Sequence, residues 1–400
     1  LDCKQFFAGE RFKFNRPAHI PIKIKLFQPN STASQEQTVS LKNSQDSFTF
    51  TQVNEQPIPS LFREFSAPII LDFEYTDEDL LYLLAHDDDP FNRWEAGQQL
   101  QSRLILSAMP KIEMKLKPIW NAKLIEVLSS SLREAHEDPA FIAEVFSTPA
   151  ESHLAESLEL VNPDLLHLAR NAFRHTIAPA LEAQLLDVYL EQTDKTPYSP
   201  DAKSAGQRAI KNVCLGLLVE LRKEEYIDLS LRQLETATNM TDEYAALQII
   251  VNTIEHESEE ALNTFYDKWR SEPLALDKWF AAQAASPKKD TLERVKKLMG
   301  HQTFDIKNPN KVFALLRTFS ANHVHFHRSD GLGYHLIADA ILELDEINPQ
   351  VAARISRSFD RWKKFDVGRQ SHAKIAMEKI INQEKLSKDT GEIISKTLQG

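Results

Sequence analysis

The period of hydrophobic and polar positions changes near residue 75. Residues 19–28, "HIPIKIKLFQ", alternate aliphatic residues with proline and lysine, which is typical of a strand with one buried face. Residues 46–53, "DSFTFTQV", and residues 68–75, "PIILDFEY", predict two further strands. Because Asn, Ser and Pro separate these short runs, we expect a small antiparallel β-sandwich over residues 1–75, incomplete at its N-terminus.

From Thr76 onward the apolar residues recur every three or four positions, which indicates amphipathic helices. Thr76 is a good N-cap residue, and acidic residues fill the first turn after it, where the helix dipole favours them. About a dozen such segments follow with short connections, and stacked helical pairs bury that many apolar stripes better than one bundle does. We therefore predict a mainly α protein, in which residues 76–400 form an irregular HEAT-like or armadillo-like helical superhelix.

Composition supports this fold and excludes some partners. The chain has 400 residues, 42% of them hydrophobic, which is enough for two domains with real cores, and only ten glycines. The net charge of −11 and the lack of a dense Lys/Arg run argue against nucleic acid or an anionic membrane as a partner. No apolar run is long enough to predict a transmembrane helix.

Two further features concern the origin of the chain. Cys3 and Cys214 lie far apart and do not form a disulfide framework, so we expect a reducing compartment, the cytoplasm. The chain begins with Leu1 instead of Met, and we therefore expect a piece of a longer protein.

The zinc-hydrolase motif HExxH is incomplete at both places where it begins. The His-Glu pairs at residues 136–137 and 256–257 are followed by Ala140 and Glu260 where the second histidine would stand. We expect both pairs at exposed helix ends. Because the chain also has no GxSxG elbow, phosphate-binding glycine loop or Cys/His nucleophile pair, we predict no catalytic residue.

The segment 321–334, "ANHVHFHRSDGLGY", places three histidines at alternating positions. In an extended conformation the three imidazoles would lie on one face, where they could hold a metal ion. The alternative is a polar loop between two helices, with a turn that Asp, Gly and Gly favour. We favour the loop, and we predict no metal site; the residues concerned are His323, His325, His327, Asp330, Gly331 and Gly333.

Six strings resemble bacterial aminopeptidases N, in the M1 family of zinc metallopeptidases. They are "HDDDPFNRWEAGQQL" (86–100), "NMTDEYAAL" (239–247), "FYDKWRSEPLALDKWFAAQAASP" (265–287), "FDIKNPNKVFALLRTF" (304–319), "FHRSDGLGY" (326–334) and "NPQVAARI" (348–355). The resemblance covers the whole chain and implies the C-terminal half of such an enzyme, a small β-sandwich followed by the large helical domain. Only His327 of the three histidines is at a family position, and the family has no metal there.

The resemblance also implies a mechanism that lies outside this chain. Zinc, held by two His and one Glu of the catalytic domain, would polarise the scissile carbonyl and activate water, with the motif glutamate as general base. That domain, with its GAMEN string and HExxH site, has no counterpart here. The implied partners are the catalytic domain of the same polypeptide and peptide substrates, with the helical domain closing over the active-site cavity.

Gln350 and Arg354 are the candidate site residues. In "NPQVAAR", Asn348 suits an N-cap and Pro349 the first helical position, so Gln350 and Arg354, four residues apart, share one helix face. The resemblance implies that Gln350 borders the pocket for the first side chain of the substrate and that Arg354 faces the channel toward the peptide. The alternative is a solvated helix face. Phe313 stands where relatives can carry a basic residue, so no role is transferred to it.

Two hypotheses follow for the function. The first is a non-catalytic C-terminal portion of a zinc aminopeptidase, which caps the active-site cavity, restricts substrate access and hydrolyses nothing alone. The second is a stand-alone helical-solenoid adaptor that binds another protein along its concave face.

Overall fold

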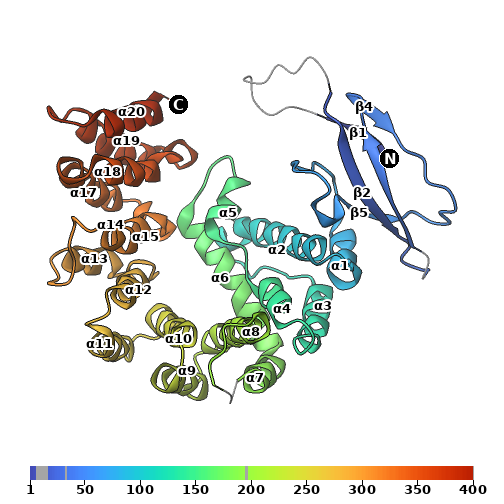
Figure 1. Cartoon of the computed structure of the whole chain (residues 1–400), viewed down its shortest axis with the longest axis horizontal. Helices are drawn as coiled ribbons and strands as arrows, with labels where there is room; N and C mark the ends of the chain where they lie inside the picture. Colours follow the sequence, from blue (N-terminus) through green and yellow to red (C-terminus); the bar gives the residue numbers. More distant parts are fainter. Residues whose placement is uncertain (6–16, 32–33, 194–196, 400) are drawn as a thin grey trace. The chain divides into compact units, whose positions relative to one another are not determined.

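The computed structural model describes residues 1–5, 17–31, 34–193 and 197–399 (Figure 1). Five strands form two antiparallel sheets among these residues, one with the order β1-β4 and the other with the order β3-β2-β5. Their bounds are β1 Asp2–Lys4, β2 Ile20–Phe27, β3 Ser34–Leu41, β4 Gln45–Ser47 and β5 Ile58–Leu61.

The alternation seen in residues 19–28 is confirmed by β2. Ile22, Ile24 and Leu26 are buried in the core of the larger sheet, together with Leu41 and Leu61. The lysines between them are half-buried and carry ion pairs at the surface. One face of β2 therefore packs while the other is solvated, as its period of two predicts.

The other two predicted strands are largely wrong. Of residues 46–53, only the first two belong to a strand, β4, and residues 68–75 form none. Pro68 lacks a backbone N–H, and Ile70 is 93% exposed, so this run of aliphatic residues does not form a buried strand. The prediction also missed β3, "SQEQTVSL", because its polar sequence shows no alternation of aliphatic residues.

Most of the rest of the described chain is helical, which confirms the mainly α prediction. The helices are α1 Asp77–His86, α2 Pro90–Glu113, α3 Ala122–Arg133, α4 Pro139–Phe146, α5 Glu151–Glu156, α6 Pro163–Ala180, α7 Glu182–Glu191, α8 Ala202–Val219, α9 Glu224–Thr236, α10 Met240–Thr253, α11 Ser258–Trp269, α12 Pro273–Ala284, α13 Thr291–Met299, α14 Pro309–Val312, α15 Thr318–Ala321, α16 His323–Phe326, α17 Leu332–Ile347, α18 Pro349–Ser356, α19 Val367–Ile381 and α20 Lys388–Gln399. Short 3₁₀ segments lie at Arg63–Phe65, Arg357–Phe359 and Trp362–Lys364, and a π-helical segment lies at Phe313–Arg317.

The chain divides into two compact units. The first contains residues 1–104 and 121–147, and the second contains residues 105–120 and those from 148 onward. The last strand ends at Leu61 and α1 begins at Asp77, yet α1, α3 and α4 belong to the same unit as the strands. A domain boundary between residues 75 and 76 therefore stays a prediction.

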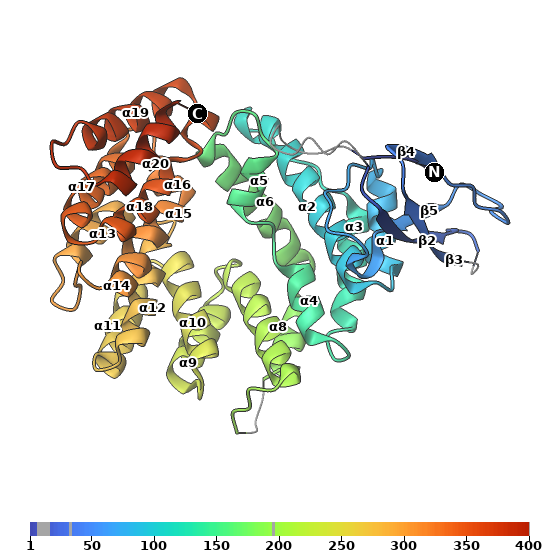
Figure 2. The same cartoon turned by 45° about the horizontal axis from the view of Figure 1, so that its top comes forward.

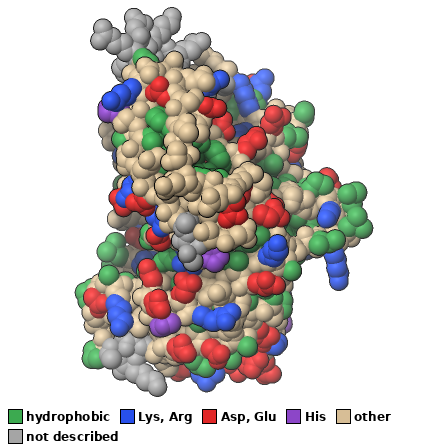
Figure 3. Space-filling model, turned by 90° about the vertical axis from the view of Figure 1, so that its right-hand side faces the viewer, with side chains coloured by type: hydrophobic (Ala, Val, Ile, Leu, Met, Phe, Trp, Pro, Cys, Tyr) green, Lys and Arg blue, Asp and Glu red, His purple; other side chains and the backbone are tan. Residues whose placement is uncertain are grey.

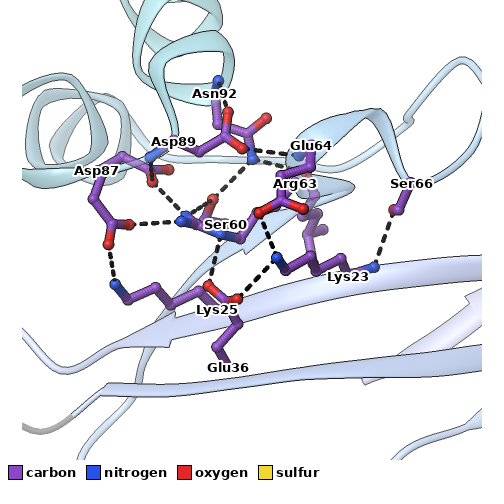
Figure 4. A network of polar contacts seen from close by, with 12 residues as sticks. Lys23, Lys25, Glu36, Ser60, Arg63, Glu64, Ser66, Asp87, Asp89 and Asn92 are labelled. Carbon is purple, nitrogen blue, oxygen red and sulfur yellow. Dashed lines mark hydrogen bonds and ion pairs between the residues drawn. The ribbon is translucent and has the colours of Figure 1, made fainter.

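A buried arginine joins the strands to the helices within the first unit (Figure 4). Arg63 donates to Ser60 at 3.1 Å, to Asp87 at 2.5 Å and to Asp88 at 2.6 Å, and the side chain of Asp87 is fully buried. Asp89 caps α2 by accepting from the backbone N–H of Asn92 at 3.0 Å. The string "HDDDP" thus has a structural role in this unit, because its carboxylates satisfy Arg63 and a helix N-terminus.

In the second unit, consecutive helices pack against one another from α7 to α13, and α17 to α20 form a further group (Figure 2). This is the stacking expected of a helical superhelix. Two distant segments also meet, because Val161 pairs with Phe365 in a parallel β-bridge and its N–H donates to the carbonyl of Lys364 at 2.7 Å. Helix α6 contacts α16 beside this bridge.

No helix within the described residues is long and apolar enough to cross a membrane. Figure 3 shows acidic and basic side chains interspersed on the face that it draws.

Candidate functional site

Helix α18 carries the two predicted site residues, and its start is as predicted. Asn348 is the N-cap, with Oδ1 accepting from the N–H of Val351 at 3.3 Å, and Pro349 occupies the first helical position. Residues on the opposite face, Val351, Ala352 and Ile355, are buried against the neighbouring helices. The face that remains exposed is therefore fixed by packing.

Gln350 and Arg354 both lie on that exposed face. Among the described residues, neither side chain has a hydrogen-bond or ion-pair partner within the chain. An arginine without a carboxylate partner is available for an anionic or carbonyl-bearing ligand. The arrangement allows a peptide contact and equally allows a solvated face, so the roles of Gln350 and Arg354 stay predictions.

Basic residues continue along the chain beyond Arg354. Arg357 and Arg361, three and seven positions later, line a cavity of about 250 Å³ within the second unit. Ser358, in the 3₁₀ segment that follows α18, lines it too. Sequence reasoning missed this cavity, because its wall joins residues 152–161 to segments that lie more than 150 residues later in the chain.

The histidine segment is not the loop that we expected from its sequence. Residues 323–326 form the short helix α16, and the chain turns only after His327. In a helix, alternate residues point to different sides, so the three imidazoles do not share one face. The rings of His323 and His327, four residues apart, lie 5.3 Å apart, and the described residues contain no group of three side chains that could hold a metal ion.

His327 is a buried structural residue. Its Nδ1 lies 2.9 Å from the hydroxyl of Tyr334, and its ring stacks on Phe365 with 3.8 Å between centroids. Burial, with further contributions from His323 and Arg369, holds the pKa of His327 well below its usual value. His327 is therefore neutral at pH 7.

The two glycines after this segment have distinct roles. Gly331 has a φ of +73°, which favours glycine, and this confirms the turn predicted there. Gly333 allows α17 to approach α16, because a Cβ atom there would lie 2.3 Å from the carbonyl oxygen of His325. Asp330 accepts from the N–H of Leu332 at 3.0 Å and pairs with Arg328.

The two partial HExxH strings lie where we expected them. His136 and Glu137 are exposed in the turn after α3, and His256 is exposed just before α11. Neither pair has a second histidine within reach in the sequence, so neither forms a zinc-hydrolase motif.

Comparison with known proteins assigns the chain to a family. Residues 77–399 match the model described as a domain of unknown function (DUF3458_C) with ARM repeats, and residues 1–74 match DUF3458, which has an Ig-like fold. The chain belongs to the DUF3458_C family. The ARM repeats of this family confirm the armadillo-like prediction, and the Ig-like fold confirms the small β domain.

The relatives of this DUF3458_C chain include three bacterial aminopeptidases N. The chain is 30% identical to that of Escherichia coli over 96% of its length, 32% identical to that of Haemophilus influenzae over 95%, and 35% identical to that of Caulobacter vibrioides over 90%. It spans 45%, 44% and 42% of these proteins, which is less than half of each. The chain is thus homologous to the C-terminal part of bacterial aminopeptidase N.

A solved structure gives the same result. The crystal structure of Legionella pneumophila aminopeptidase A in complex with aspartic acid matches the DUF3458_C chain with a TM-score of 0.86 and 32% identity. The match covers 95% of this chain and 45% of the Legionella protein. Both the sequence and the fold are therefore similar to one part of these larger proteins.

Proposed function

We propose that this chain is the non-catalytic C-terminal portion of a zinc aminopeptidase that removes N-terminal residues from peptides. The observation that carries the proposal is the alignment of 90–96% of the chain with less than half of each of three aminopeptidases N. Homology over such a length indicates that the chain has the same architecture as this part of its relatives. The aminopeptidase activity then requires that the remaining part of the polypeptide holds the catalytic groups. Such a match along nearly the whole chain does not favour a stand-alone adaptor.

The zinc of such an enzyme does not fit the described residues. No three His, Cys, Asp or Glu side chains among them converge on one point, and the only His-Glu pairs lack a second histidine. We therefore place the zinc and the reacting groups in the catalytic portion of the same polypeptide, and we assign no step of the reaction to this chain.

The portion described here would restrict access to the active-site cavity and would contact the substrate. Its helical superhelix would close over the active-site cavity, and the exposed face of α18 would contribute Gln350 near the first side chain of the peptide and Arg354 farther along it. The exposure of both residues, and their lack of partners among the residues that the structure describes, support this assignment. Cys3 and Cys214 are unpaired, in keeping with a cytoplasmic location.

Hydrolysis of alanyl and leucyl anilides by this 400-residue chain, with added zinc, tests the assignment of the catalytic groups. We expect no turnover once aminopeptidases of the expression host have been removed. Turnover that persists after this removal and is abolished by a metal chelator would show that the chain carries a catalytic site, and would overturn the proposal.

The intact mass of the protein in its native source tests the proposed parent enzyme. We expect a species about twice as long as this chain, in which a peptidase portion precedes it. A stable species of the length of this chain, without a longer form, would instead support the adaptor.

A further inference from the structure

The cavity beyond Arg354 has a wall that is fixed by the fold. Lys364 donates through Nζ to the carbonyl oxygens of Ala155, Glu156 and Leu158, at 3.2, 2.8 and 3.1 Å. These three bonds use all the protons of its ammonium group, so Lys364 holds the two sides of the cavity together. The stacked rings of His327 and Phe365 form another part of the wall.

Two buried polar atoms at this cavity have no partner. Nδ1 of His323 and Oγ of Ser358 are buried, and among the described residues neither makes a hydrogen bond. Both side chains line the cavity. A buried polar group without a partner costs about 1 to 3 kcal/mol, and native proteins keep few of them. A bound group that accepts hydrogen bonds from both atoms would remove this cost.

The charges around the cavity leave room for one negative charge. Arg357, Arg361 and Lys364 line it, against the single carboxylate of Asp360, and Glu156 pairs with Arg361 at 2.6 Å. Three positive and two negative charges leave an excess of one positive charge. Arg357 is the cation that can still receive a ligand, because its ion pair with Asp360, at 3.6 Å, is longer than a hydrogen bond and its side chain is 67% exposed.

We propose that this cavity binds a carboxylate group, which the guanidinium of Arg357 receives while the Ser358 hydroxyl and the Nδ1–H of His323 donate to it. The two-pronged guanidinium matches the two oxygens of a carboxylate, whereas a phosphate dianion would exceed the available positive charge. The group comes either from the C-terminus of a peptide or from a free carboxylic acid. The site uses only residues of this chain, so it does not depend on the proposed aminopeptidase activity.

The lowered pKa of His323 provides a signal for the binding. Burial lowers this pKa, and the charge of Arg361 also lowers it, while Glu151 raises it. His323 is therefore neutral in the empty cavity at pH 7. A carboxylate next to the imidazole favours its charged form, so binding raises the pKa of His323, which NMR of the imidazole carbons measures.

The test titrates the 400-residue chain with three probes: trialanine, trialanine amide and sodium acetate. We expect trialanine or acetate to bind and to raise the pKa of His323, and the amide to bind at least ~10-fold more weakly than trialanine. Trialanine binding far more tightly than acetate identifies a peptide C-terminus as the source, and equal affinities identify a free carboxylic acid.

Two variants locate the binding. Arg357→Gln and Ser358→Ala should each weaken the binding of the preferred acid by about tenfold or more, since each removes a hydrogen bond to a charged group. Lys363→Gln is the matched control, because it removes a nearby exposed cation that does not line the cavity. No binding of either acid, equal binding of trialanine and its amide, or unchanged affinity in both cavity variants would overturn the proposal.

Discussion

Asp164 and Arg369, 205 residues apart in the chain, form an ion pair of 2.5 Å within the second unit. The same guanidinium donates to the carbonyl oxygen of His327 at 2.5 Å and to Asp366 at 2.6 Å. Arg369 is 6% exposed, and its three contacts come from three separate segments of the chain. It therefore links the region of α6 to α16 and α19.

Replacing Arg369 should destabilise the second unit substantially. Arg369→Ala leaves the carbonyl of His327 without its donor and Asp366 without its cation, and we expect a loss of about 2 to 4 kcal/mol in the free energy of unfolding. Asp164→Asn should cost less than ~1 kcal/mol, because the side chain of Asp164 is 56% exposed. Urea unfolding of both variants measures the difference, and equal losses would contradict the central role of Arg369.

The glycines at 331 and 333 should respond differently to alanine. At position 333 the new Cβ would lie 2.3 Å from the carbonyl oxygen of His325 and 2.5 Å from that of Phe326, and a backbone cannot yield easily. At position 331 it would lie 2.5 to 2.7 Å from Cγ, Cβ and Nδ1 of His372; rotation moves the ring but not this Cβ, and the positive φ adds strain.

We therefore expect Gly333→Ala, which meets only backbone, to cost about 3 kcal/mol or more, and Gly331→Ala to cost less, about 2 kcal/mol. Thermal unfolding of the two variants under identical conditions checks the order. If Gly333→Ala lost less stability than Gly331→Ala, then α16 and α17 could move apart at little cost, contrary to the prediction.

Local signals were predictable from the sequence, and contacts between distant segments were not. The cap of α1 is a case of the first kind, because Thr76 Oγ1 accepts from the N–H of Asp79 at 3.1 Å within a single turn. The alternation in β2 succeeded for a similar reason, since its pattern records one buried face. The cap of α18 at Asn348 is another local success.

The failures occurred where tertiary contacts decide the structure. The aliphatic run at 68–75 has the composition of a strand, yet no ladder forms there. The alternation of His323, His325 and His327 suggested an extended segment or a loop, but packing against α6 and α17 accommodates a short helix. The cavity lined by Arg357, Ser358 and His323 could not be predicted from the sequence, because its wall joins residues 152–161 to residues 320–365.

The buried histidines should make stability depend on pH. The folded-state pKa of His327 is well below 6.5, and burial also lowers the pKa values of His323 and His325. The unfolded chain therefore binds more protons than the folded chain just below pH 6.5, and the free energy of unfolding falls as the pH decreases through this range. Burial raises the pKa of Asp366, but its bonds to Arg369 outweigh this effect and lower the pKa from 3.8. Asp366 therefore adds to the loss of stability only at more acidic pH.

Urea unfolding between about pH 7.5 and about pH 5 measures this dependence, which reaches at most ~1.4 kcal/mol per pH unit for each histidine. His327→Gln should lower the free energy of unfolding at every pH, because packing is lost. The change of that free energy with pH should be shallower than in the unmodified chain. His256→Gln, at an exposed position, should leave the slope unchanged. A slope that is the same in all three proteins would exclude His327 as a source of the pH dependence.

The exposed face of α18 gives a prediction for the complete aminopeptidase. If Arg354 meets the peptide beyond its first residue, Arg354→Ala should raise KM for peptides and have little effect on single-residue anilides, which have no downstream peptide. Gln350→Ala should instead change the preference among N-terminal residues. The expected size is about 0.5 to 3 kcal/mol, or a few-fold to a hundred-fold in kcat/KM.

Both variants should fold, because both side chains are exposed and have no partner among the described residues of the chain. Val351→Ala, on the buried face of the same helix, is the matched control, and it should lower stability without changing the ratio of peptide to anilide hydrolysis. Equal losses for peptides and anilides in Arg354→Ala, or no change in either variant, would show that this face is only solvated. Since a solvated face binds no substrate, that result would refute the assigned roles of Gln350 and Arg354 while leaving the homology to the C-terminal part of aminopeptidase N intact.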